Sequence, residues 1–134
     1  MSLRLFVASV AATAFLAFAF VATTSAPTST PAYALTTKCL PGIIKKRMAQ
    51  IRKKFGKIRV VSTFRRGARI RGTGRPSYHA SCRALDFKPP RGKYRAVARW
   101  LKANHGGGVG TYSCKMHHIH IDNGPRVRFH KCIK

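Results

Sequence analysis

Acidic residues are nearly absent from this chain of 134 residues. Asp86 and Asp122 are the only two, against 27 lysines and arginines, and the formal net charge is +25. Glycoside hydrolysis uses a pair of cooperating carboxylates, so only these two residues could serve it. Positive charges at this density repel one another in a compact domain and attract polyanions. The composition therefore predicts an anionic partner.

Several common motifs are missing as well. No CxxC pair occurs, which argues against a zinc finger, and the HExxH motif of the usual helical zinc peptidases is absent. No recognised nucleic-acid-binding motif is present, and the aromatic residues are not interleaved with the basic runs, so nucleic acid is not the expected partner. No internal repeat is found.

An apolar stretch of 18 residues, Leu5–Ala22, follows Arg4, and the small-residue pattern AYA ends at Ala34. These features are typical of a secretory signal, so we expect cleavage after Ala34 and a domain of residues 35–134 with a net charge of +24. The alternative is an uncleaved membrane anchor, in which case the protein would also meet a membrane. Outside the cytoplasm, the available polyanions are cell-wall polymers, lipid headgroups or lipopolysaccharide.

Four cysteines lie beyond the expected cleavage site: Cys39, Cys82, Cys114 and Cys132. An even number of cysteines in a small exported domain predicts two disulfides, with three possible connectivities. Each bridge contributes about 2–4 kcal/mol, which is comparable to the whole stability of a marginal domain.

Residue periodicity predicts two helices and a small sheet. The expected elements are a helix over 41–55, a strand over 57–63, a surface loop over 65–76, a strand over 83–87, a helix of about a dozen residues around 94–105, and a hairpin of 109–112 with 117–121. This order predicts an α+β domain with a small antiparallel sheet and two helices. We expect Trp100 in the core, His105 as a solvated helix cap, and His117 and His130 away from any site.

Histidines and one aspartate form the candidate site. His118 and His120 are two residues apart in an expected strand, so both face the same side of the sheet. His79 precedes Asp86 by seven residues, and Asp86 interrupts an apolar strand, where a carboxylate requires a partner. Two imidazoles and one carboxylate, from His79, Asp86 and His120, are a ligand set for catalytic zinc. The alternative is that Asp86 pairs with an arginine and that the HIH element is only a polar strand.

Four short motifs follow one another along the chain: STFR at 62–65, SYHASCRALD at 77–86, GGVGTY at 107–112 and HIHID at 118–122. In order and spacing they resemble the D-alanyl-D-alanine carboxypeptidase and murein endopeptidase family of zinc peptidases, which shares its fold with lysostaphin-type peptidases and hedgehog domains. The resemblance covers nearly all of residues 60–122 and implies this fold.

The resemblance implies a role for each matching residue. His79, Asp86 and His120 would bind Zn²⁺, and His118 would act beside the zinc as the general base or stabilise the tetrahedral intermediate. Arg65 would face the substrate, and Ser77 matches the signature at a position expected to bind substrate. The chain departs from the family at Cys82, where glycine is usual. It also has no glutamate to act as the base, so the HxH subtype is the relevant comparison.

The implied zinc site also suggests a disulfide pairing. Cys82 lies between two of the implied ligands, and Cys114 lies in the turn that leads to His118. The site should therefore bring Cys82 close to Cys114, which leaves Cys39 to pair with Cys132.

The sequence thus predicts an exported zinc peptidase that acts on cell-wall (peptidoglycan) peptides, of the D,D-carboxypeptidase or endopeptidase type. Its basic surface would hold it to an anionic envelope polymer. The alternative is a non-catalytic cationic binding module on the same fold.

Overall fold

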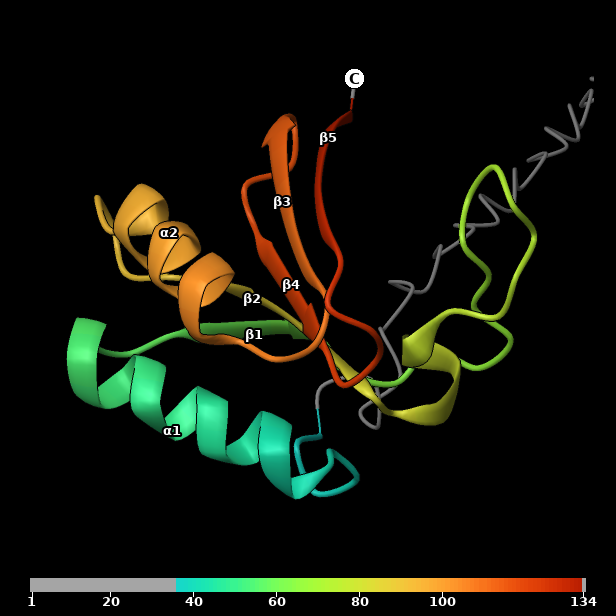
Figure 1. Cartoon of the computed structure of the whole chain (residues 1–134), viewed down its shortest axis with the longest axis horizontal. Helices are drawn as coiled ribbons and strands as arrows, with labels where there is room; N and C mark the ends of the chain where they lie inside the picture. The colour runs from blue at the N-terminus through green and yellow to red at the C-terminus, as the bar shows by residue number, and fades with distance from the viewer. Residues whose placement is uncertain (1–35, 134) are drawn as a thin grey trace, which may run out of the picture.

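The computed structural model describes residues 36–133, so the expected signal segment lies outside the described residues. Figure 1 shows the arrangement of the elements. In chain order they are α1 (Gly42–Phe55), β1 (Arg59–Ser62), the 3-10 helix η2 (Tyr78–Ser81), β2 (Ala84–Lys88), α2 (Tyr94–Asn104), β3 (Val109–Cys114), β4 (Ile119–Asp122) and β5 (Arg128–Ile133). The α+β class, both helices and the predicted strands are confirmed.

The five strands form one sheet in the order β1-β2-β4-β3-β5. The pairs β1–β2, β2–β4 and β3–β4 are antiparallel, as predicted. The pair β3–β5 is parallel, so the expectation of a wholly antiparallel sheet is wrong. Strand β5 was not predicted, because Arg128–Ile133 has no clear alternation of apolar and polar residues.

Both helices pack on one face of the sheet. Gly56 ends α1 with φ 103°, a left-handed conformation that glycine adopts without strain. The buried core joins the apolar sides of the helices to alternate strand residues: Ile44, Met48, Ile51, Val97, Leu101, Leu85, Phe87, Val109, Ile119 and Ile121. Successive strand side chains point to opposite faces. Asp86 and His120 therefore project from the face that the helices leave open.

The structure corrects the disulfide pairing. Cys39 is bonded to Cys82, and Cys114 is bonded to Cys132. Two disulfides were expected, but the pairs Cys82–Cys114 and Cys39–Cys132 are wrong. The reason is β5, which runs beside β3 and places Ser113 in register with Cys132, so that Cys132 reaches Cys114.

Two other expectations need correction. His105 ends α2, but it is only 1% exposed and is not solvated; its Nε2–H donates to the Asp122 carbonyl oxygen at 2.8 Å. Trp100 is only partly buried at the edge of the core. Its ring meets Phe55 edge-on, and the Arg47 guanidinium lies 5.1 Å from its centroid.

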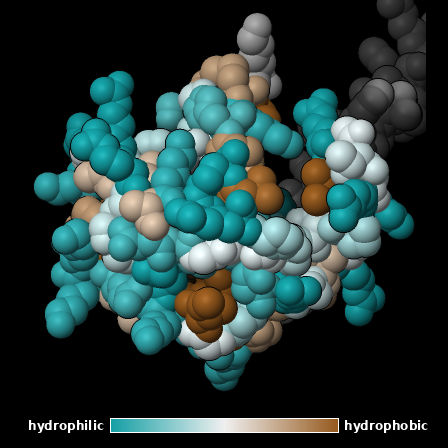
Figure 2. Space-filling model, in the orientation of Figure 1, coloured by the Kyte–Doolittle hydropathy of each residue, from teal (hydrophilic) through white to brown (hydrophobic). Residues whose placement is uncertain are grey.

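The surface is mainly hydrophilic. Figure 2 shows one face on which polar side chains project in many directions and hydrophobic atoms form small, separate patches. The expected loop over 65–76 extends beyond the sheet, away from the helices (Figure 1). Within residues 36–133, no helix has the length and apolar character needed to cross a membrane.

Candidate metal centre

Three buried side chains converge on the open face of the sheet. Asp86 on β2 is directly opposite His120 on β4, and His79 comes from η2. One donor atom from each of the three residues lies within 4.8 Å of the other two. All three are less than 10% exposed, so the cluster is shielded from bulk water. The structure therefore brings together the three residues that the sequence predicted as zinc ligands.

The environment of His79 decides which of its nitrogens faces the cluster. Its Nδ1 lies 2.8 Å from the backbone oxygen of Thr63, and a carbonyl can only accept, so Nδ1 carries the proton. Nε2 is therefore the nitrogen that faces the cluster, and it lies 3.1 Å from Asp86 Oδ2. The Ser77 hydroxyl accepts from the backbone N–H of His79 and caps the turn that carries it. In this structure Ser77 is thus a capping residue of η2. Substrate binding by its side chain stays a prediction.

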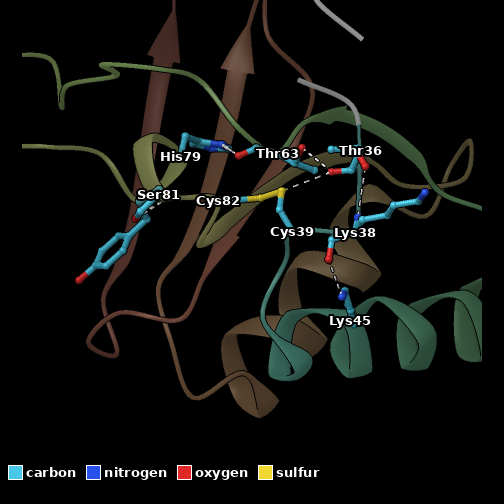
Figure 3. The surroundings of a disulfide bond; sticks show 9 residues. Thr36, Lys38, Cys39, Lys45, Thr63, His79, Ser81 and Cys82 are labelled. Atoms are coloured by element: carbon cyan, nitrogen blue, oxygen red, sulfur yellow. Dashed lines mark hydrogen bonds between the residues drawn. A yellow bond between two sulfur atoms is a disulfide. The ribbon is translucent and has the colours of Figure 1, made fainter. Parts of the chain in front are cut away.

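The segment before α1 supports this side of the site. Figure 3 shows His79, Thr63 and Thr36 joined in series, with the Cys39–Cys82 disulfide beside them. The Thr63 hydroxyl donates to the Thr36 carbonyl oxygen at 2.7 Å. Cys82 has φ 55°, a left-handed conformation that favours glycine, which explains why the resembling family has glycine there. The disulfide ties the residue that follows η2 to the N-terminal segment.

His120 is oriented by a second carboxylate. Its Nε2 lies 3.0 Å from Asp122 Oδ2, and its Nδ1 lies 2.8 Å from Asp86 Oδ1. Asp122 is itself held by the backbone N–H groups of Gly108 and Gly124, which donate to Oδ1 at 3.1 and 2.8 Å. With Nε2–H donating to Asp122, Nδ1 is the nitrogen that faces Asp86 and would bind a metal in place of its proton. A carboxylate behind a ligating histidine is the usual second partner in zinc sites.

This role of Asp122 was not predicted from the sequence. The available signal was the HIHID alternation, which places residues 118, 120 and 122 on one face. Gly108 belongs to the same arrangement, since a Cβ there would collide with the Asp122 carboxylate.

The donor set fits a zinc ion. Four tetrahedral ligands at about 2.0–2.2 Å from zinc lie about 3.3–3.6 Å from one another. The separation of His79 Nε2 and His120 Nδ1 is 3.3 Å, within this range. The carboxylate oxygens lie closer, with 3.1 Å between His79 Nε2 and Asp86 Oδ2 and 2.8 Å between His120 Nδ1 and Asp86 Oδ1, so a bound zinc would move the donors apart by up to about 0.5 Å. Two nitrogens and one oxygen leave a fourth position for water or substrate, as in catalytic sites.

Burial and hydrogen bonds perturb both charged members of the cluster. Burial raises the pKa of Asp86, but hydrogen bonds from His120 and His79 outweigh it and hold that pKa well below its usual range. Burial lowers the pKa of His120, but hydrogen bonds to Asp122 and Asp86 outweigh it and raise that pKa to about 9. Asp86 thus stays ionised in the cluster, as a metal ligand must be.

His118 lies beside the three ligands and does not belong to the set. Its Nε2 is 4.0 Å from Asp86 Oδ1, and its ring packs against Tyr112 with centroids 4.4 Å apart. The Tyr94 hydroxyl hydrogen-bonds to the backbone of both residues. It lies 2.8 Å from the Tyr112 carbonyl oxygen and 3.1 Å from the His118 carbonyl oxygen. Burial lowers the pKa of His118, which favours its neutral form. His118 therefore lies next to the ligands, and its role as a general base stays a prediction.

Arg65 lies at the rim of the cluster. Its Nη2 is 3.6 Å from Asp86 Oδ2, and 51% of its side chain is exposed. Its backbone N–H donates to the His79 carbonyl oxygen at 3.0 Å. The guanidinium is thus anchored beside the metal ligands while part of it faces solvent.

The chain belongs to the peptidase M15 family, whose family model matches residues 24–122. No curated protein and no solved structure gave a match. The M15 peptidases are zinc-dependent, and His79, Asp86 and His120 are the group that could hold the metal. The family and the cluster together support a zinc metallopeptidase.

Proposed function

Because the chain is a member of the peptidase M15 family, we propose that it is an exported zinc peptidase that cleaves peptidoglycan peptides at a D-alanine. The observation that carries the proposal is the paired orientation of the two histidines. Thr63 holds the proton of His79 on Nδ1, and Asp122 holds the proton of His120 on Nε2. His79 Nε2 and His120 Nδ1 therefore both face Asp86, and a metal bound there would replace the proton that His120 Nδ1 shares with the carboxylate.

The chain's own residues perform the remaining chemistry. Bound zinc would polarise the scissile carbonyl and lower the pKa of water. His118 Nε2, next to Asp86, accepts the proton of the attacking water and returns it to the leaving amine. No glutamate competes for this role, because the chain contains none. The Tyr94 hydroxyl and the Tyr112 ring fix His118 for these transfers.

Arg65 is the proposed substrate-binding group. A guanidinium can hold a carboxylate through two parallel hydrogen bonds. Its partly exposed position beside Asp86 suits the free C-terminal carboxylate of a D-Ala-D-Ala peptide. This favours the D,D-carboxypeptidase over the endopeptidase, which recognises no chain end.

Two disulfides in a domain of this size support export to an oxidising compartment. Cell-wall peptides are found there.

The test is mass spectrometry of purified muropeptides after incubation with the zinc-loaded protein. The expected product is a peptide shortened by one D-alanine, and its formation should stop with chelator and return with zinc. Stoichiometric zinc without any cleaved product would instead favour the non-catalytic binding module.

A further inference from the structure

A hollow of about 590 Å³ lies where β1 begins and β2 ends. Four of its six lining residues are cations: Lys57, Arg59, Lys88 and Arg91. All four are exposed. The two acids of the chain are both buried, Asp86 in the metal cluster and Asp122 behind His120, so no acidic side chain remains to neutralise these cations.

The strand register adds a second observation. Arg59 is directly opposite Lys88 in the β1–β2 pair. Like charges in direct cross-strand contact destabilise a sheet. An anion bound between them would remove this repulsion, and the two guanidinium and two ammonium groups would supply many donors to its oxygens.

One lining residue, Lys88, is close to the metal ligands along β2. Lys88 is two residues beyond Asp86 on β2, so both side chains project from the same face, about 7 Å apart along the strand. Phe87, between them, is buried on the helix side. An anion held by Arg59 and Lys88 would therefore lie on the open face, next to the metal ligands.

We infer that Lys57, Arg59, Lys88 and Arg91 form a binding site for the phosphate groups of an anionic polymer. The two arginines can hold phosphate oxygens in two-point hydrogen bonds, and four unneutralised cations suit a group that carries more than one negative charge; a carboxylate polymer is the alternative that the experiment tests. Phosphate binding itself is independent of peptidase activity. A further assignment is that the bound polymer also carries the peptide to be cleaved. Only this assignment rests on the proposed function.

The experiment compares two variants of equal charge by titration with fluorescent inorganic polyphosphate. The hollow variant carries Lys57→Gln, Arg59→Gln, Lys88→Gln and Arg91→Gln. The control variant carries Lys46→Gln, Arg52→Gln, Lys53→Gln and Arg99→Gln, which remove two lysines and two arginines from exposed helix positions. The hollow variant should bind polyphosphate at least about tenfold more weakly than the control, with a shallower dependence of log Kd on log salt concentration.

Equal weakening in both variants would overturn the inference, because binding would then follow net charge alone. Polyglutamate of matched charge should bind the wild-type protein more weakly than polyphosphate, and equal binding would overturn the phosphate assignment. If the hollow variant does not fold, the pair Lys57→Gln with Arg91→Gln, both outside the strands, is compared with Lys53→Gln and Arg99→Gln. If muropeptides are not cleaved at all, the proposed function fails, while the polyphosphate comparison still decides this site.

Discussion

Replacement of Asp122 by asparagine should weaken zinc binding without removing any zinc ligand. Asp122 Oδ1 accepts from two backbone N–H groups, those of Gly108 and Gly124. An asparagine must keep its oxygen at that position, because both partners are donors. Its NH₂ group then takes the place of Oδ2, 3.0 Å from His120 Nε2. Two donors would face each other there.

The imidazole can relieve this conflict only by moving its proton from Nε2 to Nδ1. Nδ1 is the nitrogen that lies 2.8 Å from Asp86 and faces the metal position. Zinc binding at Nδ1 would then require that proton to leave Nδ1. If it returned to Nε2, it would again face the NH₂ group of the introduced asparagine. Loss of a partner behind a ligating histidine typically costs 10–100-fold in metal affinity, or about 1.4–2.7 kcal/mol. We expect an increase in the zinc Kd of this size for Asp122→Asn.

The zinc Kd is measured by competition with a chromophoric chelator. NMR supplies an independent readout: the Nε2–H proton of His120 should be protected from exchange in the zinc-loaded wild type and should lose that protection in the variant. The control is the double variant Asp122→Asn with Asn123→Asp, which restores the net charge one residue away. If the carboxylate acted only through its charge, the double variant would recover zinc affinity. A zinc Kd within about threefold of wild type for the single variant, or full recovery in the double variant, would refute the reasoning.

Three further predictions concern residues around the ligands. His118→Ala should keep stoichiometric zinc and lower kcat by about 10²–10⁴-fold, because a general base is lost. The control is His117→Ala, which changes an exposed neighbour. Loss of zinc from His118→Ala would contradict its assigned role. Arg65→Lys should slow hydrolysis of a peptide with a free C-terminal carboxylate more than that of its amidated form, since lysine cannot make the two-point contact. The control Arg66→Lys should affect the two peptides equally. Equal losses on both peptides for Arg65→Lys would count against the carboxylate contact. Tyr94→Phe should destabilise the metal-free protein by about 0.5–1.5 kcal/mol, because the partly buried backbone N–H of Tyr112 loses its acceptor. An unchanged thermal midpoint would show that this hydroxyl is dispensable.

The sequence by itself determined the two helices and the faces of the central strands. Helical spacing identified Ile44, Met48 and Ile51, and all three are buried. Strand alternation placed His118 and His120 on one face, and Asp86 was conspicuous as a carboxylate between two apolar residues. Such periodic signals are local, so they can be read without knowing the partner of each segment.

The tertiary structure decided which segments meet. The strand β5 pairs in parallel with β3, on the side of β3 opposite to β4. This long-range contact determines that Cys132 bonds to Cys114. His105 is buried because it reaches the Asp122 carbonyl, 17 residues along the chain. The support of the metal ligands also comes from distant backbone: the Thr63 carbonyl orients His79 from 16 residues away. A sequence pattern specifies the face on which a side chain lies, but the groups that orient that side chain are brought to it only when the sheet assembles.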